Sequence, residues 1–349
     1  MLRSLTRLGA ATRVVRIQCP SFSTSAVSNA NVGVIGAGQV GRAVALGLLR
    51  GGHSVSVTDP STLNAKELTE QGAKWVDTAS EVVAGKEVVI TALPAPPHIR
   101  QVMEEEGVLF KIKEGACWID HTTTDADETK RLAVIAQNRG LKMLEAPLTG
   151  GLELLKAGLM TVFVGGDTED MKKYEPLIRS YTDTVLYMGP IGSASVVKVI
   201  SNMLCAVHMV VAGESAMIAK RHGINLQAFF DGIRASAGNS FVFETEAPLM
   251  FNGSFDPGFK IALHCKDLDL GRKLAFDAKV PIEVLGLVEQ IYRRAMHKYG
   301  EDAGSSHPPK LLEDDLKEPL RQEGYDNWYY TIEKVQGGGI AVVHKFDKK

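Results

Sequence analysis

The chain has 349 residues, of which 45% are apolar and 23% charged, and its formal net charge is −2. The length suggests about two domains, and the composition is that of an ordinary soluble globular protein. Such a small net charge gives no electrostatic reason to expect a nucleic-acid or membrane partner. None of the four cysteines forms a Cys-x-x-Cys pattern, so the sequence indicates neither a zinc site nor a disulfide framework. We therefore expect no metal.

Residues 1–30 differ from the rest of the chain because they carry four arginines and no acidic residue. The arginines alternate with leucine and valine, and a serine-rich stretch follows. A secretory signal would need a continuous apolar block of roughly 7–15 residues, and the segment has none. This pattern is typical of a mitochondrial presequence, so we expect residues 1–30 to direct the protein to the mitochondrial matrix. The alternative is a basic N-terminus that carries no targeting information.

Apolar segments alternate with helical patterns from residue 31 to residue 191. The predicted strands are 31–36, 54–59, 87–94, 117–124, 141–151, 159–166 and 184–189. Strands separated by helices indicate βαβ units and a parallel sheet.

Residues 192–300 have a helical pattern without a convincing strand. The segment 193–222 is apolar around much of its circumference, which favours a helix buried in a domain or against a second subunit. Its most apolar part, 203–219, is shorter than the roughly 20 residues needed to cross a bilayer. Residues 301–349 form a C-terminal extension whose role the sequence does not indicate.

A glycine motif directly follows the first predicted strand and opens a helix. Gly36 permits a tight turn, Gly38 lets a pyrophosphate approach the backbone, and Gly41 lets the helix pack closely on the strand. Asp59 ends the next strand, about 20 residues on, where a carboxylate would bind the ribose 2′-hydroxyl and repel a 2′-phosphate. We therefore predict a Rossmann-type domain over residues 31–191 that prefers NAD to NADP, with loop contacts from Gly36, Ala37, Gly38, Gln39, Val40 and Gly41.

Three further loops follow predicted strands and should meet at the same sheet edge. Leu93 and Pro94 end one strand, and Thr123 follows another. In 149–151, a threonine hydroxyl and two glycine N–H groups form a loop suited to binding a carboxylate. The alternative for this loop is a simple turn that closes the sheet. Since ligands of open α/β folds bind at the carboxyl ends of the strands, these loops favour one shared site.

Lys198 lies within the apolar run of the predicted helix 193–222, and Asn202 follows one turn later on the same face. Taken alone, this favours a surface lysine whose stem is buried. Burial and a nearby cation both make a lysine lose its proton more readily, as a general base requires.

In chain order, the motifs GAGQVG, LP, DHTT, EAPLTGG, GSASVVKVISN and FKIALHCKDL resemble those of the β-hydroxyacid dehydrogenase family over residues 31–300. That family includes 3-hydroxyisobutyrate dehydrogenase and tartronate semialdehyde reductase. This sequence departs from the usual family pattern at Glu145 and Thr149, which replace Asp and Ser, and at Leu148 and His121. The resemblance implies an α/β fold, with the Rossmann-type domain followed by an all-α domain over 192–300.

The resemblance also implies residue roles. Lys198 becomes the catalytic acid/base and Asn202 a substrate ligand. The substrate carboxylate is expected on Thr149, Gly150 and Gly151. Implied cofactor contacts are Leu93, Pro94, Thr123, Lys266 and Asp267.

The expected activity is NAD-linked oxidation of a short 3-hydroxy acid, foremost 3-hydroxyisobutyrate, to its semialdehyde. Tartronate semialdehyde reduction is the alternative within the family, and a non-catalytic NAD-binding protein is the alternative of another class. The presence of Lys198, Asn202 and Lys266 argues against the latter, and Lys198 also argues against an imine reductase. A small hydroxy acid is the expected partner, with assembly into a homodimer or homotetramer through the helical domain.

Overall fold

The computed structural model describes residues 29–335 and 339–346, so the predicted presequence lies outside the described residues. These residues divide into two compact units. The first contains residues 29–204 and 262–293, and the second contains residues 205–261 and 294–346. We describe each unit by itself.

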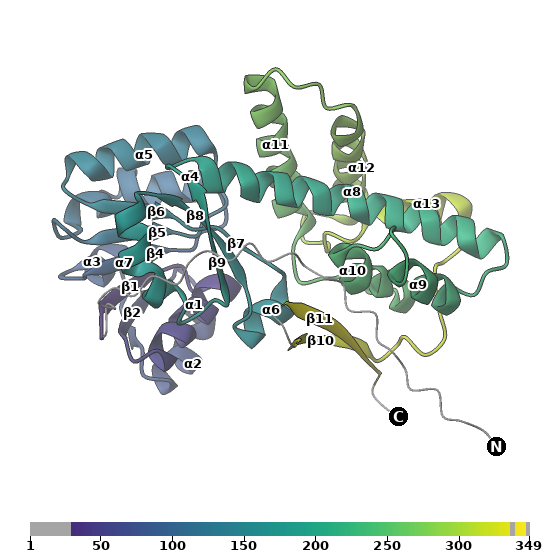
Figure 1. Cartoon of the computed structure of the whole chain (residues 1–349), viewed down its shortest axis with the longest axis horizontal. Helices are drawn as coiled ribbons and strands as arrows, with labels where there is room; N and C mark the ends of the chain where they lie inside the picture. The colour runs from purple at the N-terminus through teal and green to yellow at the C-terminus, as the bar shows by residue number, and fades with distance from the viewer. Residues whose placement is uncertain (1–28, 336–338, 347–349) are drawn as a thin grey trace. The chain divides into compact units, whose positions relative to one another are not determined.

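The first unit is built on a nine-stranded sheet in the order β3-β2-β1-β4-β5-β6-β8-β7, with β9 paired to β8 (Figure 1). The strands are β1 Asn31–Ile35, β2 Ser54–Thr58, β3 Lys74–Trp75, β4 Val88–Thr91, β5 Cys117–Asp120, β6 Lys142–Glu145, β7 Leu148–Thr149, β8 Thr161–Gly166 and β9 Thr184–Gly189. Strands β1 to β6 pair in parallel, as predicted, whereas β8 runs antiparallel to β6. The expected strand 141–151 is instead two strands, separated at Pro147, which has no N–H to give to a ladder.

Helices cover both faces of this sheet (Figure 1). Helices α3 and α5 pack on one face, where their side chains join Ile35, Val89 and Trp118 in one buried cluster. Helix α1 lies against the segment that follows α7, because a Cβ on Gly47 would come within 2.4 Å of the Tyr181 Cβ. The helices of this region are α1 Gln39–Arg50, η1 Thr62–Asn64, α2 Ala65–Glu70, α3 Ala79–Val83, α4 Pro96–Arg100, η2 Gln101–Glu105, η3 Val108–Lys111, α5 Ala126–Asn138, α6 Leu152–Ala157 and α7 Thr168–Ile178.

Helix α8, Ser193–Arg221, begins in the first unit and continues into the second. Its length and composition would suffice to cross a membrane, and 44% of its most apolar 18-residue stretch is buried within the structure. Helices α11, Ile261–Asp277, and α12, Glu283–Tyr299, also contribute to the first unit. There Gly271, which has no side chain, lets α11 pack closely on α8: a Cβ at this position would lie 2.5 Å from the Met203 Sδ.

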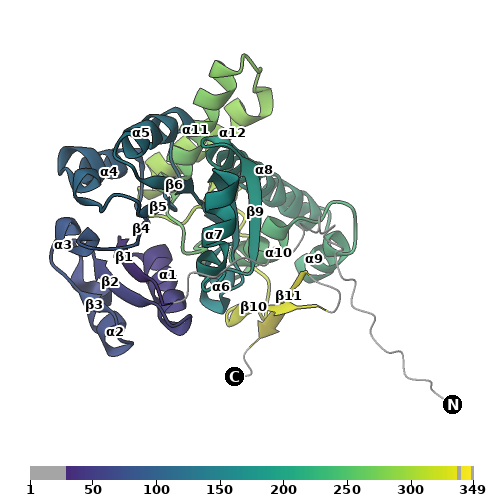
Figure 2. The same cartoon turned by 60° about the vertical axis from the view of Figure 1, so that its left-hand side comes forward.

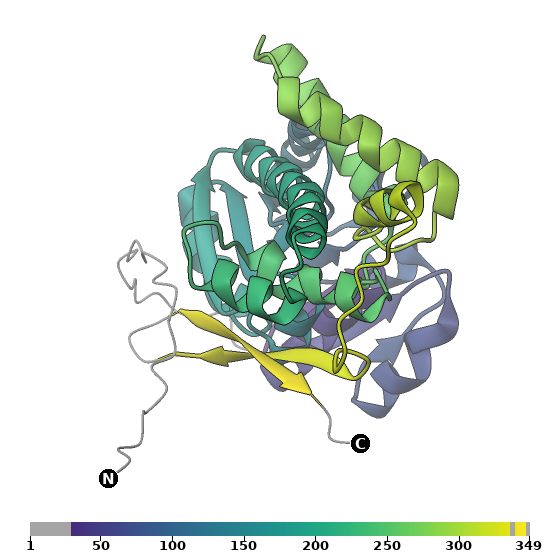
Figure 3. The same ribbon diagram turned by 90° about the vertical axis from the view of Figure 1, so that its right-hand side faces the viewer.

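The second unit is helical and ends in a hairpin. It contains α9 Leu226–Arg234, α10 Phe241–Asn252, α13 Pro308–Leu316, β10 Trp328–Lys334 and β11 Ile340–Phe346. Across both units, helices α8 to α12 confirm the helical pattern predicted for residues 192–300. Strands β10 and β11 are antiparallel and lie near α9 and α10 (Figure 2), forming the twisted yellow ribbon of Figure 3.

Aromatic side chains attach the hairpin to the helices of this unit. Trp328 is 7% exposed, and its Nε1 donates to the Nδ1 of His344 at 3.0 Å. The ring of His344 meets that of Phe230 edge-on, and Tyr325 contacts both Trp328 and Phe251. The hairpin is therefore part of the core of the second unit.

Replacing Trp328 with alanine is expected to lower the free energy of unfolding by about 3 kcal/mol, because the change leaves a cavity and an unpaired imidazole nitrogen. The matched control is Tyr329→Ala, at an adjacent side chain that is 44% exposed, with an expected change of less than about 1 kcal/mol. Urea unfolding followed by circular dichroism measures both. Equal effects at the two positions would contradict a core role for the hairpin.

Candidate active site

The glycine loop joins β1 to α1 at the carboxyl edge of the sheet. Gly36 has φ +97°, and a Cβ there would lie 2.4 Å from the Ala92 carbonyl oxygen. A Cβ on Gly41 would lie 1.8 Å from the Gly36 carbonyl oxygen. By contrast, a Cβ on Gly38 would meet nothing within 4 Å. Internal packing thus requires two of the glycines, whereas Gly38 borders open space, as the approach of a pyrophosphate requires.

Asp59 holds this loop in place from the end of β2. Its Oδ2 accepts from the Ala37 N–H and its Oδ1 from the Ser61 N–H, both at 2.7 Å. Asn64 donates from Nδ2 to the Ala37 carbonyl at 2.7 Å, so the peptide units on both sides of Ala37 are fixed. Sequence reasoning missed Asn64, because a single asparagine in a short turn has no distinctive signal. Gln39 and Val40 follow as the first residues of α1.

The loops after β4 and β5 are joined by hydrogen bonds. The Leu93 N–H donates to Thr122 Oγ1 at 3.1 Å, and the Thr122 N–H donates to Asp120 Oδ1 at 3.0 Å. Burial raises the pKa of Asp120 to about 6. Pro94 follows Leu93 directly in the sequence. The buried Oγ1 of Thr124, two residues after Thr122, has no hydrogen-bond partner among the described residues. The predicted convergence is therefore present for the loops after β4 and β5.

His121 connects the ends of β5 and β6. Its Nδ1 lies 2.5 Å from the Ala146 carbonyl, and its Nε2 lies 3.1 Å from the Tyr181 hydroxyl. Burial lowers the pKa of His121 to about 4, so the ring is neutral near pH 7. The tautomer with hydrogen on Nδ1 satisfies both contacts, since the carbonyl can only accept. The residue that departs from the family pattern thus serves as a link between two strands.

Lys198 lies at the start of a line of polar contacts between α8 and α11. Its Nζ donates to Asn202 Oδ1 at 3.0 Å, and Asn202 Nδ2 donates to Asp267 Oδ2 at 2.5 Å. Asp267 is 1% exposed and Asn202 is 9% exposed, whereas Lys198 is partly buried. Because a carboxylate only accepts, Asp267 fixes the orientation of the amide, and the amide oxygen then faces Lys198.

Lys266 extends this line to the loop after β5. Its Nζ lies 2.8 Å from Asp267 Oδ1 and donates to the Thr123 carbonyl at 3.1 Å. His264, one turn before Asp267 on α11, has its Nε2 2.9 Å from the Asn202 carbonyl. Burial lowers the pKa of His264, which favours the neutral ring. Five of the predicted positions, namely Lys198, Asn202, Asp267, Lys266 and Thr123, therefore form one group, here called the lysine group.

The lysine group does not include the predicted carboxylate loop at 149–151. Thr149 ends β7, where it pairs with Thr161. Gly150 and Gly151 have φ values of +134° and +83°, which only glycine adopts readily, and α6 begins at the next residue. These backbone angles turn the chain sharply between β7 and α6.

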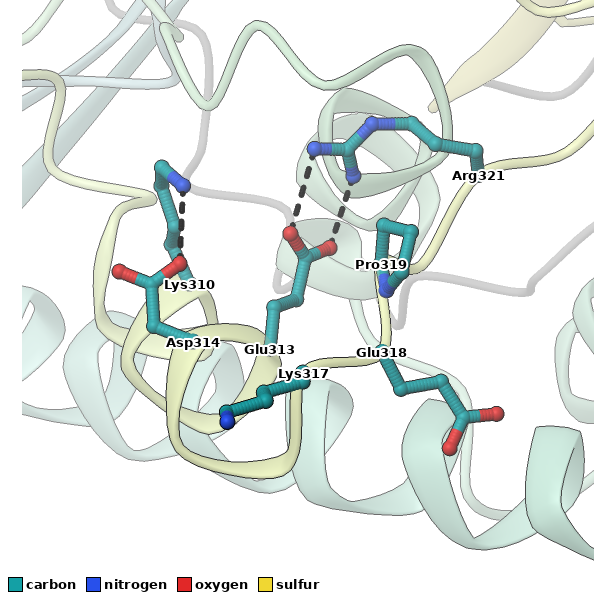
Figure 4. Close-up of a pocket in the computed structure, with 7 residues that line it drawn as sticks. All are labelled: Lys310, Glu313, Asp314, Lys317, Glu318, Pro319 and Arg321. Carbon is teal, nitrogen blue, oxygen red and sulfur yellow. Dashed lines mark hydrogen bonds and ion pairs between the residues drawn. The ribbon is translucent and has the colours of Figure 1, made fainter.

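A hollow lies in the helical unit, around α13 (Figure 4). Charged side chains line it, and most of them form ion pairs. Lys310 pairs with Asp314, Arg321 makes two bonds to Glu313, and Glu318 pairs with Arg221 outside the lining. Over the described ranges, no group of three His, Cys, Asp or Glu side chains is placed to hold a metal. This hollow is therefore a weaker candidate than the sheet edge.

Two family models match the chain. The NAD-binding domain of 6-phosphogluconate dehydrogenase matches residues 31–189. The NAD-binding domain of NADP-dependent 3-hydroxyisobutyrate dehydrogenase matches residues 192–312. Together they cover both the sheet edge and the helices that carry the lysine group.

Individual relatives agree with these matches. The NAD-dependent L-serine dehydrogenase of Pseudomonas aeruginosa is 30% identical, over 75% of this chain and 91% of its own length. The mitochondrial 3-hydroxyisobutyrate dehydrogenase of Mus musculus is 29% identical, over 79% of this chain and 85% of its own. The structure of Mycobacterium tuberculosis 3-hydroxyisobutyrate dehydrogenase with L-serine superposes with a TM-score of 0.74 at 26% identity, covering 81% of this chain and 99% of that one. The chain belongs to the β-hydroxyacid dehydrogenase family, the NAD(P)-dependent oxidoreductases that act on the CH–OH group of hydroxy acids.

Proposed function

We propose that this protein is an NAD-dependent dehydrogenase of a short 3-hydroxy acid, with Lys198 as the general acid/base and 3-hydroxyisobutyrate as the first candidate substrate. The observation that carries this proposal is the hydrogen-bonded line from Lys198 through Asn202 to Asp267. It places an amine beside a fixed amide, in the same unit as the glycine loop.

The residues at the sheet edge fit a dinucleotide. Gly38 leaves open space at the start of α1, where the helix N-terminus attracts a phosphate. Asp59 retains acceptor capacity for ribose hydroxyls beyond its two backbone bonds. The Thr124 hydroxyl, for which the described residues offer no hydrogen-bond partner, adds a polar group near the ends of the neighbouring strands. Leu93, Pro94 and Thr123 would complete the contacts, and the bound nicotinamide would supply the hydride acceptor.

The chain's own part in the reaction is to move a proton. As the C–H bond of the alcohol carbon breaks with its electron pair, the hydroxyl proton passes to Lys198 Nζ and the C=O bond forms. The neutral amine still has an N–H for Asn202 Oδ1, so its lone pair can face the hydroxyl. Asn202 has a second N–H beyond the one bound to Asp267, and this can donate to the substrate. In the reductive direction Lys198 returns the proton.

The choice of substrate rests on two expected contacts and on the substrates for which the relatives are named. A substrate whose carboxylate binds the 149–151 loop and whose hydroxyl faces Lys198 is expected to be a 3-hydroxy acid. The mouse relative is named for 3-hydroxyisobutyrate and the Pseudomonas relative for L-serine, which is also a 3-hydroxy acid. Tartronate semialdehyde remains the alternative in the reductive direction. The mitochondrial location and the homo-oligomer stay predictions.

A substrate panel tests the proposal. Purified protein is assayed with hydroxyisobutyrate, hydroxypropionate, glycerate, serine and hydroxybutyrate, each with NAD and with NADP, by the absorbance of the reduced cofactor. The highest kcat/KM is expected for hydroxyisobutyrate with NAD. A preference for glycerate would move the assignment to the tartronate semialdehyde branch, and no turnover of any 3-hydroxy acid would refute it.

The preference for NAD rests on the charges around the adenosine end of the predicted site. Asp59 would repel a 2′-phosphate. Arg42, in the first turn of α1, is a cation that could attract one, but its Nη1 contacts both carboxylate oxygens of Glu67 at 2.7 Å. The arginine is thus already neutralised by its own neighbour.

Asp59→Ser is expected to raise the ratio of kcat/KM for NADP to that for NAD by about tenfold or more, because a repulsive charge is removed. Combining it with Glu67→Gln, which releases Arg42, should raise the ratio further. Glu70→Gln, which changes an exposed carboxylate that pairs only loosely with Lys66, serves as the control. An unchanged ratio in the double variant would show that Asp59 does not select the cofactor.

A further inference from the structure

Glu145 ends β6, and its side chain turns to the first residues of α8. It is 1% exposed. One carboxylate oxygen accepts from the N–H groups of Gly192 and Ala194, at 2.6 and 2.9 Å. The other accepts from the N–H and the hydroxyl of Ser195, at 3.1 and 2.5 Å. All four of these hydrogen bonds are buried.

These bonds make Glu145 the cap of α8. The first N–H groups of a helix have no partner within it, and a nearby Ser, Thr, Asp or Asn usually accepts from them. Here the acceptor comes from a strand 47 to 50 residues earlier. A carboxylate suits this position, because it offers only acceptors and because negative charge is favoured at a helix N-terminus.

The cap acts on the face of the helix that carries the proposed chemistry. Ser195, Lys198 and Asn202 stand at positions i, i+3 and i+7 and therefore share one face of α8. Thr149, at the start of the proposed carboxylate loop, follows Glu145 by only four residues. The buried Glu145 side chain thus joins α8, which carries Lys198, to β6, which precedes the 149–151 loop.

We propose that Glu145 is a positioning residue for the reaction: by capping α8 from β6 it sets the place of Lys198 relative to the loop 149–151. This inference rests on the proposed function of Lys198. A misplacement of about 1 Å can cost on the order of 100-fold in rate, so the cap acts on kcat without touching substrate.

Gly165 provides the space for this longer acid. It pairs with Glu145 across the sheet, and a Cβ there would lie 2.2 Å from Glu145 Oε1 and 2.9 Å from its Cγ and Cδ. Since four hydrogen bonds hold the carboxylate, it cannot move aside without leaving α8. The resemblance places an aspartate at this position in the family, and an aspartate would need less room. Glu145 and Gly165 are therefore a matched pair.

This pairing gives a test that does not depend on deleting the carboxylate. Gly165→Ala, Glu145→Asp and the double variant are compared with wild type, together with Glu145→Gln and Ser195→Ala. For each, kcat and KM are measured with the panel substrate that is turned over fastest. Dinucleotide Kd and the thermal midpoint are measured on the same samples.

Gly165→Ala is expected to lower kcat by about 10- to 100-fold while leaving the dinucleotide Kd within about twofold of wild type. The double variant is expected to recover most of the lost kcat, because the shorter acid leaves room for the new methyl group. Glu145→Gln should lose kcat as well, since its NH₂ group faces the donors of α8. Ser195→Ala keeps the carboxylate and the three backbone bonds, so its loss should be the smallest.

Wild-type kcat in folded Gly165→Ala and Glu145→Gln would overturn the proposal. So would losses in the thermal midpoint alone, or a double variant no better than Gly165→Ala. If Glu145→Gln does not fold, Gly165→Ala and the double variant still decide the question. If Lys198→Ala is inactive while these variants keep full rate, only the positioning role fails; if Lys198→Ala is active, the proposed function fails first.

Discussion

Lys198→Ala is expected to lower kcat by about 10²- to 10⁴-fold, the usual contribution of a positioned general acid/base. Dinucleotide Kd should stay within about twofold of wild type, because the glycine loop and Asp59 form the predicted cofactor site without it. Steady-state kinetics with the best panel substrate and calorimetric titration with NAD measure the two quantities.

Two further lysine variants separate proton transfer from charge. Lys198→Arg keeps a cation within reach of Asn202, but a guanidinium does not give up its proton, so this variant should be nearly as inactive as Lys198→Ala. Lys66→Ala removes an exposed lysine of α2 that lies 3.8 Å from the Glu70 carboxylate, and it should behave as wild type. Substantial activity in Lys198→Arg would show that charge alone suffices, and wild-type kcat in Lys198→Ala would remove the lysine from the mechanism.

The sheet and the long helix could be predicted from the sequence because their signals are local. Apolar runs bounded by Gly, Pro or Asp marked β1, β2, β4 and β5 to within a few residues. The two-residue strand Lys74–Trp75 has too few residues for a periodic pattern, and the hairpin β10–β11 is held by contacts with α9 and α10 rather than by its own alternation. Its place in the helical core depends on tertiary packing, which composition does not show.

The candidate site was predictable only where motif spacing carries the chemistry. The spacing of Lys198 and Asn202 indicated a shared helix face, and the structure adds that Asp267 orients the amide between them. Partners that are distant in sequence left no signal. Asn64 reaches back 27 residues to Ala37, and Glu145 reaches forward to Gly192; neither pairing follows any helical or strand period. Such contacts depend on which strand ends and helix ends the fold brings together.

The glycine loop gives the second large effect. Gly38→Ala is expected to weaken NAD binding by more than about tenfold, or ~1.4 kcal/mol, because its new methyl group occupies the open space where the pyrophosphate is expected. Stability should change by about 1 kcal/mol or less, since the φ of −63° suits alanine and no protein atom lies within 4 Å of the new Cβ. Calorimetric titration and urea unfolding of the same preparation measure the two effects.

Gly41→Ala is the matched contrast, because both changes add one methyl group to the same loop. At Gly41 the methyl group would lie 1.8 Å from the Gly36 carbonyl oxygen, and neither backbone can give way without opening the contact between α1 and β1. We expect about 3 kcal/mol of destabilisation from this overpacking, so binding is lost together with the fold. If Gly38→Ala instead binds NAD like wild type, the pyrophosphate does not lie against this glycine. If it unfolds as readily as Gly41→Ala, the loop is glycine-rich for packing alone.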